Sequence, residues 1–284
     1  AATRFESAVV LGHHDARRAR LNGAALRSAE QLRLEFHTLV FTPDRLAVVK
    51  GGPAVRRAYF DRMLGRVTPS LASLPSEYGR ALTQRNEALR RCRAGISTLD
   101  AVEPWTEQVA GLGSELDSAR ADLAEALGPA FGASAETLGL PAATLGYERR
   151  PLTVADLAAR LTRDVERGTT GLGPHLRDVE VRADDRDLRG FGSQGEQRTA
   201  VLALLLAEAA VLAERRGAPP LLLLDDVLSE LDAGRRRALL EGLPADGQIL
   251  VSATSVDALP ASAPEPALVV TVRRDGDASR AEAA

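Results

Sequence analysis

A serine–glycine turn opens the longest apolar helix that the sequence predicts, and its residue types suit the binding of an anion. The turn is Ser193–Gln197, and the apolar segment behind it runs to Gly217. A helix that begins there leaves its first backbone N–H groups free and points the positive end of its dipole outward, which favours a phosphate. The simpler interpretation is a capping box formed by Ser193 and Glu196, and the turn taken alone favours it.

Two aspartates, Asp225 and Asp226, follow the leucine run Leu221–Leu224. The run predicts a buried strand of a parallel sheet, and ligands of open α/β sheets bind at the carboxyl ends of such strands. One carboxylate there can hold Mg²⁺ while its neighbour orients an attacking water. An acidic turn that caps the next helix is the alternative, but adjacent carboxylates are costly without a cation or donors. The two motifs together therefore indicate half of an ATP site.

Two further segments could extend that half-site. Ser229–Asp232 either caps the helix expected around Arg235 or faces the nucleotide of a partner subunit. Gln248–Thr254 predicts a buried strand that ends in hydroxyls, and Thr254 could reach a γ-phosphate, although a plain strand end also explains it. The phosphate-cradling P-loop, G-x-x-x-x-G-K-[ST], does not occur in the sequence, whose only lysine is Lys50.

The composition is ordinary for a globular protein, with 45% hydrophobic and 26% charged residues. Cys92 is the only cysteine, which excludes a disulfide framework and a zinc cluster and fits a reducing cytosol. No uncharged apolar run reaches the length of a membrane span. We therefore expect a cytoplasmic protein that works without a membrane.

The net charge of −3 gives no global sign of nucleic-acid binding, so DNA contacts would depend on local arginine clusters. Such clusters could track a DNA backbone, but surface helices carry these charges anyway, and the sequence leaves the DNA-contacting residues unknown. Few aromatic residues are present, so recognition of a duplex or junction backbone fits better than base stacking. The clusters are Arg17, Arg18 and Arg20; Arg56 and Arg57; Arg90, Arg91 and Arg93; and Arg235 to Arg237.

The N-terminal part predicts short strands. Ser7–Leu11 is β-prone, and Asn22-Gly23 predicts a hairpin because a type I′ turn needs positive φ at both central positions. Thr42 and Pro43 predict the start of a helix, with Thr42 as its cap.

From Val55 to Leu127 apolar residues repeat at helical spacing, and prolines interrupt the pattern up to Gly128-Pro129. We expect several antiparallel helices here, because the prolines argue against one long coiled coil. The second half predicts alternating helices and strands of a parallel sheet, with a last edge strand at Val269–Val272. Its other predicted elements are a helix at Leu152–Val165, a strand at Val179–Val181 and a helix around Arg235–Leu243.

With these motifs in order, the chain resembles the ABC-type ATPases of the SMC class, and most closely the RecF family of bacterial recombination mediators. The matching segments cover most of the chain and are jointly specific, since a generic ABC protein would share only the signature and the acidic block. They are SQGEQRT at Ser193–Thr199, LLLLDDVLSELD at Leu221–Asp232, RGTTGLGPH at Arg167–His175, Phe41–Asp61, Tyr78–Arg90 and Trp105.

The resemblance implies a role for each candidate site residue. The signature loop would contact the γ-phosphate of ATP held by a second protomer, and it comprises Ser193, Gln194, Gly195, Glu196 and Gln197. Asp225 would serve Mg²⁺, and Asp226 would stand where many ABC ATPases carry a catalytic glutamate. Ser229 and Asp232 would belong to the D-loop, and Thr254 would take the switch position, where many ABC proteins use histidine.

The resemblance also implies an α/β fold, an ABC/SMC-type P-loop NTPase head with an inserted helical lobe. Because Walker A precedes the matching segments in the family, we expect the chain to begin partway through a gene product and to be inactive alone. The implied division places strands of the ATPase lobe in residues 1–54, the helical lobe in 55–150, the rest of the ATPase lobe in 151–274 and a disordered tail in 275–284.

For the intact protein, the resemblance implies an ATP-dependent DNA-binding mediator of gap repair, replication restart and SOS induction. ATP would join two copies on gapped or junction DNA, hydrolysis would be weak, and RecR and RecO would be partners near the nucleoid. Two alternatives stay open: a truncated interaction module without nucleotide chemistry, and the ATPase head of another ABC-type protein.

Overall fold

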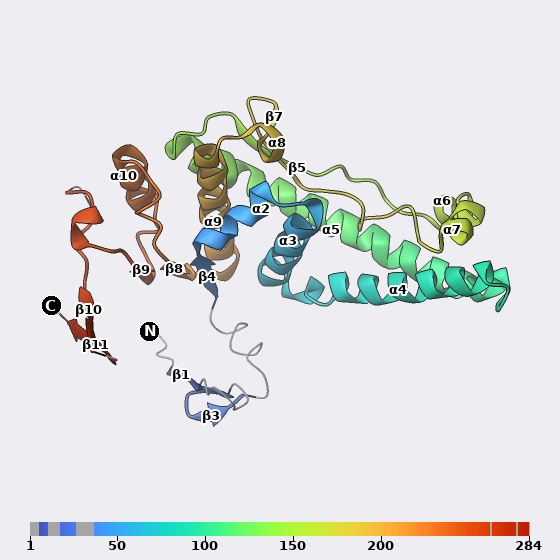
Figure 1. Cartoon of the computed structure of the whole chain (residues 1–284), viewed down its shortest axis with the longest axis horizontal. Helices are drawn as coiled ribbons and strands as arrows, with labels where there is room; N and C mark the ends of the chain where they lie inside the picture. The colour runs from blue at the N-terminus through green and yellow to red at the C-terminus, as the bar shows by residue number, and fades with distance from the viewer. Residues whose placement is uncertain (1–5, 11–17, 27–36, 262, 277, 284) are drawn as a thin grey trace.

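The computed structural model describes residues 6–10, 18–26, 37–261, 263–276 and 278–283. It consists of a head of mixed strands and helices, from which a long helical arm projects (Figure 1). Leu11 and Arg17, which belong to a predicted strand and a predicted arginine cluster, lie outside the described residues. In the described part, no helix is long and apolar enough to cross a membrane.

The central sheet of the head contains three parallel strands in the order β4-β8-β9. They are β4 (Thr38–Phe41), β8 (Leu221–Leu224) and β9 (Ile249–Val251). Leu39 pairs with Leu222, and Leu224 pairs with Val251, so the three carboxyl ends share one edge. The predicted parallel sheet is thereby confirmed, including the strand that ends at the two aspartates.

Helix α9 (Gln194–Arg216) is the central helix of the head and ends where Gly217 adopts the left-handed conformation, with φ of 69°. It is buried along most of its length and packs against α5, as well as against shorter helices. Even Glu208 is buried on α9, where it pairs with Arg66 at 2.5 Å and accepts a hydrogen bond from Tyr59. This pair fixes the central helix to the base of the arm.

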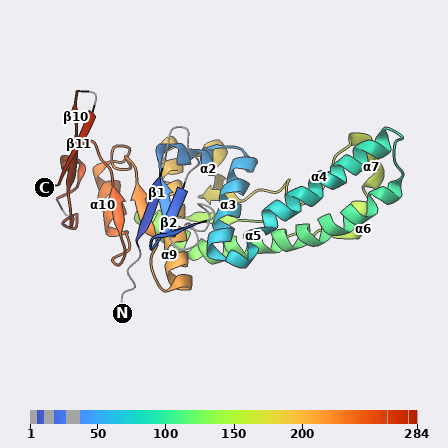
Figure 2. The same cartoon turned by 90° about the horizontal axis from the view of Figure 1, so that it is seen from below.

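The arm is built from two long antiparallel helices that lie side by side in both views (Figures 1 and 2). They are α4 (Leu74–Arg93) and α5 (Glu103–Thr137), joined through η3 (Leu99–Ala101), and α3 (Pro53–Val67) with η2 (Pro69–Leu71) leads into them.

The predicted break at Gly128-Pro129 is wrong, because Pro129 lies inside α5. Pro129 and Glu125, whose carbonyl loses its helical donor, are both exposed, so water can satisfy that carbonyl. The buried face of the helix meanwhile continues through Leu127 and Phe131.

After α5 the chain runs along the arm to its tip and back before it enters α9 (Figure 1). The helix predicted at Leu152–Val165 is two short helices, because the chain turns at Ala159-Arg160 between them. The strand predicted at Val179–Val181 is present as β6, but it pairs antiparallel with β5 and β7 in a separate sheet, β5-β6-β7, and does not join the parallel sheet. The elements are β5 (Ala143–Gly146), α6 (Val154–Ala158), α7 (Leu161–Arg167), β6 (Glu180–Ala183), β7 (Arg186–Asp187) and α8 (Leu188–Phe191).

A buried polar network holds the returning chain against the arm. Arg85 on α4 has no exposed surface, and its Nη1 donates to Asp164 at 3.0 Å and to Thr170 at 2.7 Å. Its Nε donates to Thr106 of α5 at 3.0 Å. Burial lowers the pKa of His175 in the same loop, where its ring lies 2.6 Å from the Tyr78 hydroxyl.

The N-terminal strands form a separate antiparallel sheet in the order β1-β2-β3. The Asn22-Gly23 hairpin is confirmed, since both residues have positive φ, 49° and 79°, and connect β2 to β3. The strands are β1 (Ser7–Val10), β2 (Arg18–Leu21) and β3 (Ala24–Ala25). Thr42 precedes η1 (Pro43–Leu46) and α2 (Ala47–Lys50), but its side chain makes no capping hydrogen bond.

The C-terminal part corrects two predictions. Residues 275–284 were expected to be a disordered tail, whereas β11 (Ala278–Ala283) pairs along its length with β10 (Val270–Asp275). Gly276, with φ of 61°, permits the tight turn between them. The strand predicted at Val269–Val272 as an edge strand of the central sheet therefore belongs to this separate hairpin. Helix α10 (Ala233–Glu241) and η4 (Val256–Ala258) complete the head.

Candidate nucleotide-binding site

The first turn of α9 forms the predicted capping box and still leaves donors free. The Ser193 hydroxyl accepts from the Glu196 N–H at 3.2 Å, and the Glu196 carboxylate accepts from the Ser193 N–H at 2.7 Å. The backbone N–H groups of Gln194 and Gly195 have no acceptor among the described residues. Gly195 is partly exposed, so the two interpretations of this turn are compatible: a capped helix whose mouth can still bind an anion.

Gln197 has a different place from its neighbours in the signature. Its side chain is buried, and its Nε2 donates to the carbonyl of Leu188 at 2.8 Å. Leu188 is itself fully buried, whereas Phe191 at the end of the same short helix is 73% exposed. Gln197 thus fixes α8 to α9, and it is Ser193 and Gly195 that lie at the open mouth.

The capping box predicts a pH dependence for the start of α9. The Ser193 N–H, with help from Arg186 at 3.2 Å, lowers the pKa of Glu196. Since the folded pKa lies below the unfolded value of about 4.3, the box stabilises the turn fully above that value and loses its effect as pH falls through the folded pKa. Hydrogen exchange at the Ser193 amide should therefore accelerate, after correction for intrinsic rates, only below about pH 4. Protection that is constant to pH 2 would contradict this.

The acidic pair lies at the open edge of the central sheet, as predicted. Asp225 is exposed, and its N–H continues the ladder by donating to the Phe41 carbonyl at 3.0 Å. Asp226 adopts the left-handed conformation with φ of 49°, which aspartate tolerates better than glutamate does. That conformation gives a physical reason for aspartate at the position that the resemblance aligns with the catalytic glutamate of many ABC ATPases.

Ser252 joins the two acids, although none of the sequence motifs marks it as a site residue. Its hydroxyl lies 2.6 Å from Oδ1 of Asp225 and accepts from the Asp226 N–H at 3.0 Å. The sequence contained a signal for it, because Ser252 lies at the carboxyl end of a predicted parallel strand, and beside β8 its register partner is the residue after Leu224. Thr254, the predicted switch residue, is exposed two positions further on and makes no hydrogen bond among the described residues.

The predicted D-loop contacts both parts of the site. The Ser229 hydroxyl donates to the carbonyl of Asp226 at 2.9 Å, and Asp232 caps α10 by accepting from the Arg235 N–H at 2.9 Å. The Arg235 guanidinium lies 3.6 Å from Asp232, and a Cβ placed on Gly195 would lie 3.2 Å from it. The structure therefore forms two clusters, one around the acids and one around the mouth of α9, with the D-loop between them.

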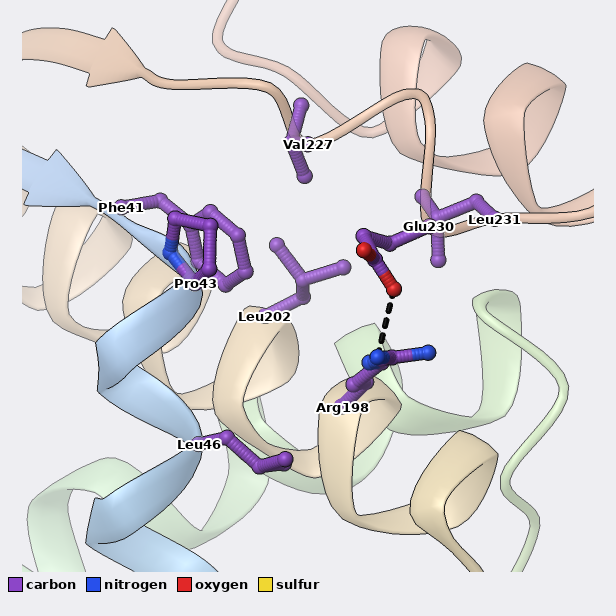
Figure 3. A pocket seen from close by; sticks show the side chains of 8 residues that line it. All are labelled: Phe41, Pro43, Leu46, Arg198, Leu202, Val227, Glu230 and Leu231. Atoms are coloured by element: carbon purple, nitrogen blue, oxygen red, sulfur yellow. Dashed lines mark ion pairs between the residues drawn. The ribbon is translucent and has the colours of Figure 1, made fainter.

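A small pocket beside the D-loop shows how α9 and this loop are connected (Figure 3). Arg198 of α9 pairs with Glu230 at 2.5 Å, and apolar side chains, among them Leu202, line the rest of the pocket. The pocket volume is about 40 Å³, whereas sites for ligands of drug size measure about 300–1,000 Å³. It therefore serves as a joint between the two elements and is too small for a nucleotide.

The donor set at the acidic pair fits a magnesium ion that keeps most of its waters. No group of three or more metal-binding side chains occurs within the described residues, so a metal at this edge would depend on the pair Asp225 and Asp226. Mg²⁺ is commonly held in this way, by one or two carboxylates together with substrate phosphates. The buried Oδ1 of Asp226 has no hydrogen-bond partner among the described residues, so this oxygen can accept from a ligand or from metal-bound water.

Comparisons with known proteins place this geometry in a family, although no family model matches the chain. It is similar to the DNA replication and repair protein RecF of Heliobacterium modesticaldum, at 36% identity over 254 residues, covering 84% of this chain and 68% of that protein. RecF of Lacticaseibacillus casei is 34% identical over 263 residues, covering 87% of this chain and 71% of that protein.

Solved structures give the same result. The recombination mediator protein RecF-ATPrS in the RecFOR pathway has a TM-score of 0.74 at 25% identity, covering 89% of this chain and 72% of that one. RecF-ATP in the same pathway also has a TM-score of 0.74, at 26% identity, with 90% and 70% covered. An Smc head domain derived from Pyrococcus furiosus, at 16% identity and a TM-score of 0.51, supports the fold alone. The chain belongs to the RecF family, and its fold is that of an ABC/SMC-type ATPase head.

Proposed function

We propose that this chain supplies one half of a composite ATP site in DNA replication and repair. The mouth of α9 would close on a nucleotide that is held by a second copy, and the acidic edge of the sheet would serve a nucleotide bound to its own copy. The observation that carries this proposal is the open mouth: two free N–H groups, at Gln194 and Gly195, beside the Arg235 guanidinium. RecF relatives solved with ATP and ATPrS support a nucleotide as the ligand.

Each side chain would have a separate task. Asp225 would hold Mg²⁺, Asp226 would orient the attacking water, and Ser193 would seal the terminal phosphate across the dimer interface. Bound Mg·ATP would supply the negatively charged phosphates that both copies contact. Because nucleotide binding favours the dimeric state, the site can act as a switch even when hydrolysis is slow. Ser229, Asp232 and Thr254 would complete the interface as D-loop and switch.

We propose further that the dimer clamps gapped or junction DNA and works with RecR and RecO in gap repair, replication restart and SOS induction, in the cytoplasm at the nucleoid. The division into an ATPase lobe, with segments 1–54 and 151–274, and a helical lobe at 55–150 belongs to the same proposal. Among the arginine clusters, Arg56 is buried and forms an ion pair with Asp178 at 2.6 Å, whereas Arg91 and Arg93 at the arm tip are exposed. The arm tip is therefore a better candidate for DNA contact than the base.

The proposal is tested by replacing Ser193 with arginine in a chimera that joins a P-loop segment from a RecF relative to residue 1. Light scattering should show ATP-driven dimerisation of the parent chimera. Ser193→Arg should abolish it, because the new side chain fills the anion site at the mouth, while ATP binding by a single copy persists. The 284 residues alone, which contain no P-loop motif, should bind ATP weakly and not hydrolyse it.

Ser70→Arg is the matched control, since Ser70 is an exposed serine at the base of the arm whose side chain forms no hydrogen bond with any described residue. It should dimerise like the parent. A chimera that binds ATP but dimerises equally with Ser193→Arg would refute the composite site. A chimera that binds no ATP would favour the interaction module without nucleotide chemistry.

A further inference from the structure

One hydroxyl group, that of Ser252, contacts both acids of the candidate site. It lies 2.6 Å from Oδ1 of Asp225 and 3.0 Å from the backbone nitrogen of Asp226. The main chain of Ser252 is fixed as well, because its N–H donates to the Leu224 carbonyl at 2.9 Å, as the last hydrogen bond between β8 and β9. Ser252 is therefore held in place by the same two strands whose ends it connects.

The chemistry at this position requires a group that donates and accepts at once. An ionised carboxylate such as Asp225 only accepts, and the N–H of Asp226 only donates. A hydroxyl satisfies both, and a hydrogen bond to a charged acceptor is of the stronger kind. The contact occupies Oδ1 of Asp225 and leaves Oδ2 without a hydrogen-bond partner among the described residues.

The second acid depends on the same hydroxyl. Asp226 holds the left-handed conformation that only a minority of residues other than glycine adopt. Its N–H is held by Ser252 and its carbonyl by Ser229, so the two serines fix the peptide groups on both sides of the turn. The direction of the Asp226 carboxylate follows from that backbone.

We propose that Ser252 is the positioning residue of the magnesium site: it aims the free oxygen of Asp225 at the metal and holds the turn of Asp226. This inference rests on the proposed role of Asp225 as the magnesium ligand. It assigns to Ser252 the link between β9 and the acidic pair, a link that Thr254 does not make in this structure.

Mn²⁺, as a probe for Mg²⁺, tests the proposal on the 284-residue chain without nucleotide. Mn²⁺ should broaden the NMR signals of the Asp225, Asp226 and Ser252 amides in the wild-type chain in a saturable way. Ser252→Ala should weaken this binding by about fivefold, the size of one net hydrogen bond. Ser252→Thr, which keeps the hydroxyl, should restore it, and Ser252→Cys, a weak donor of similar shape, should resemble Ser252→Ala.

Ser255→Ala is the matched control, because Ser255 caps η4 through Asp257 and forms no hydrogen bond with Asp225 or Asp226. It should bind Mn²⁺ like the wild type. Equal binding by the wild type, Ser252→Ala and Ser252→Cys would overturn the role of Ser252 and leave the acidic pair intact as the metal site. Absence of saturable broadening at the acids in the wild type would overturn the metal assignment of Asp225 itself, and the role of Ser252 with it. Failure of Ser252→Thr to restore binding would also count against the hydroxyl.

Discussion

Arg85→Ala should lower the free energy of unfolding by about 3–5 kcal/mol, the usual cost of leaving a buried charge without its partner. Arg85 of α4 is wholly buried against α5 and the returning loop. Its loss would leave the equally buried Asp164 without its ion-pair partner. Thr106 and Thr170 would lose their shared donor at the same time. Thermal unfolding followed by circular dichroism should show a midpoint lowered by about 10 °C.

Arg91→Ala is the control for this prediction, because Arg91 is exposed on the same helix and forms no ion pair among the described residues. It should change the stability by less than about 0.5 kcal/mol. The double variant Arg85→Met/Asp164→Asn should lose less free energy of unfolding than its two single variants lose in sum, since it removes both charges together. If Arg85→Ala unfolds at the same temperature as Arg91→Ala, the buried network does not hold the arm together.

Asp225→Asn should reduce ATP hydrolysis by at least about a hundredfold in the P-loop chimera, because metal ions supply several kcal/mol of charge stabilisation in such reactions. Asparagine retains the size of the side chain and its contact with Ser252, so the fold should survive. The measurement is single-turnover phosphate release, together with Mn²⁺ broadening at Asp226 in the 284-residue chain. Both signals should disappear in the same variant.

Asp246→Asn makes the same chemical change at an exposed loop position before β9, without any hydrogen bond to the site. Its hydrolysis and its Mn²⁺ binding should match those of the parent. Near-normal turnover by Asp225→Asn would remove Asp225 from the metal site, and the assignment would then have to pass to Asp226.

The sequence predicted the parts of the fold that depend on local patterns. The leucine run Leu221–Leu224 became β8 residue for residue, and the capping box, the Asn22-Gly23 hairpin and the Gly217 helix end all occur as expected. The parallel pairing of β8 with β9 also followed from the alternation of helices and strands, whereas the position of β4 beside β8 did not. In each case the signal comes from residues that are neighbours in the chain.

The predictions that failed depend on contacts between different segments of the chain. Pro129 was expected to end a helix, but tertiary packing of the buried face of α5 outweighs one lost hydrogen bond at an exposed position. The tail was expected to be disordered from its composition, yet pairing with β10 gives its backbone partners. Arg235 was missed as a site residue because its contact with Gly195 joins segments far apart in the sequence, which no local pattern reports. Ser252 was missed because its role appears only when two predicted parallel strands are placed side by side.

The doubled path of the chain along the arm has a mechanical consequence. The polypeptide leaves the head in α4 and returns to it in α5. It then runs along the arm a second time, out to α7 and back, before it reaches α8 and the mouth of α9. Arg85 clamps that second trip to the first near the far end. A load applied at the tip is therefore transmitted along two tethered spans, one ending on the body of α9 and the other a few residues before its opening turn.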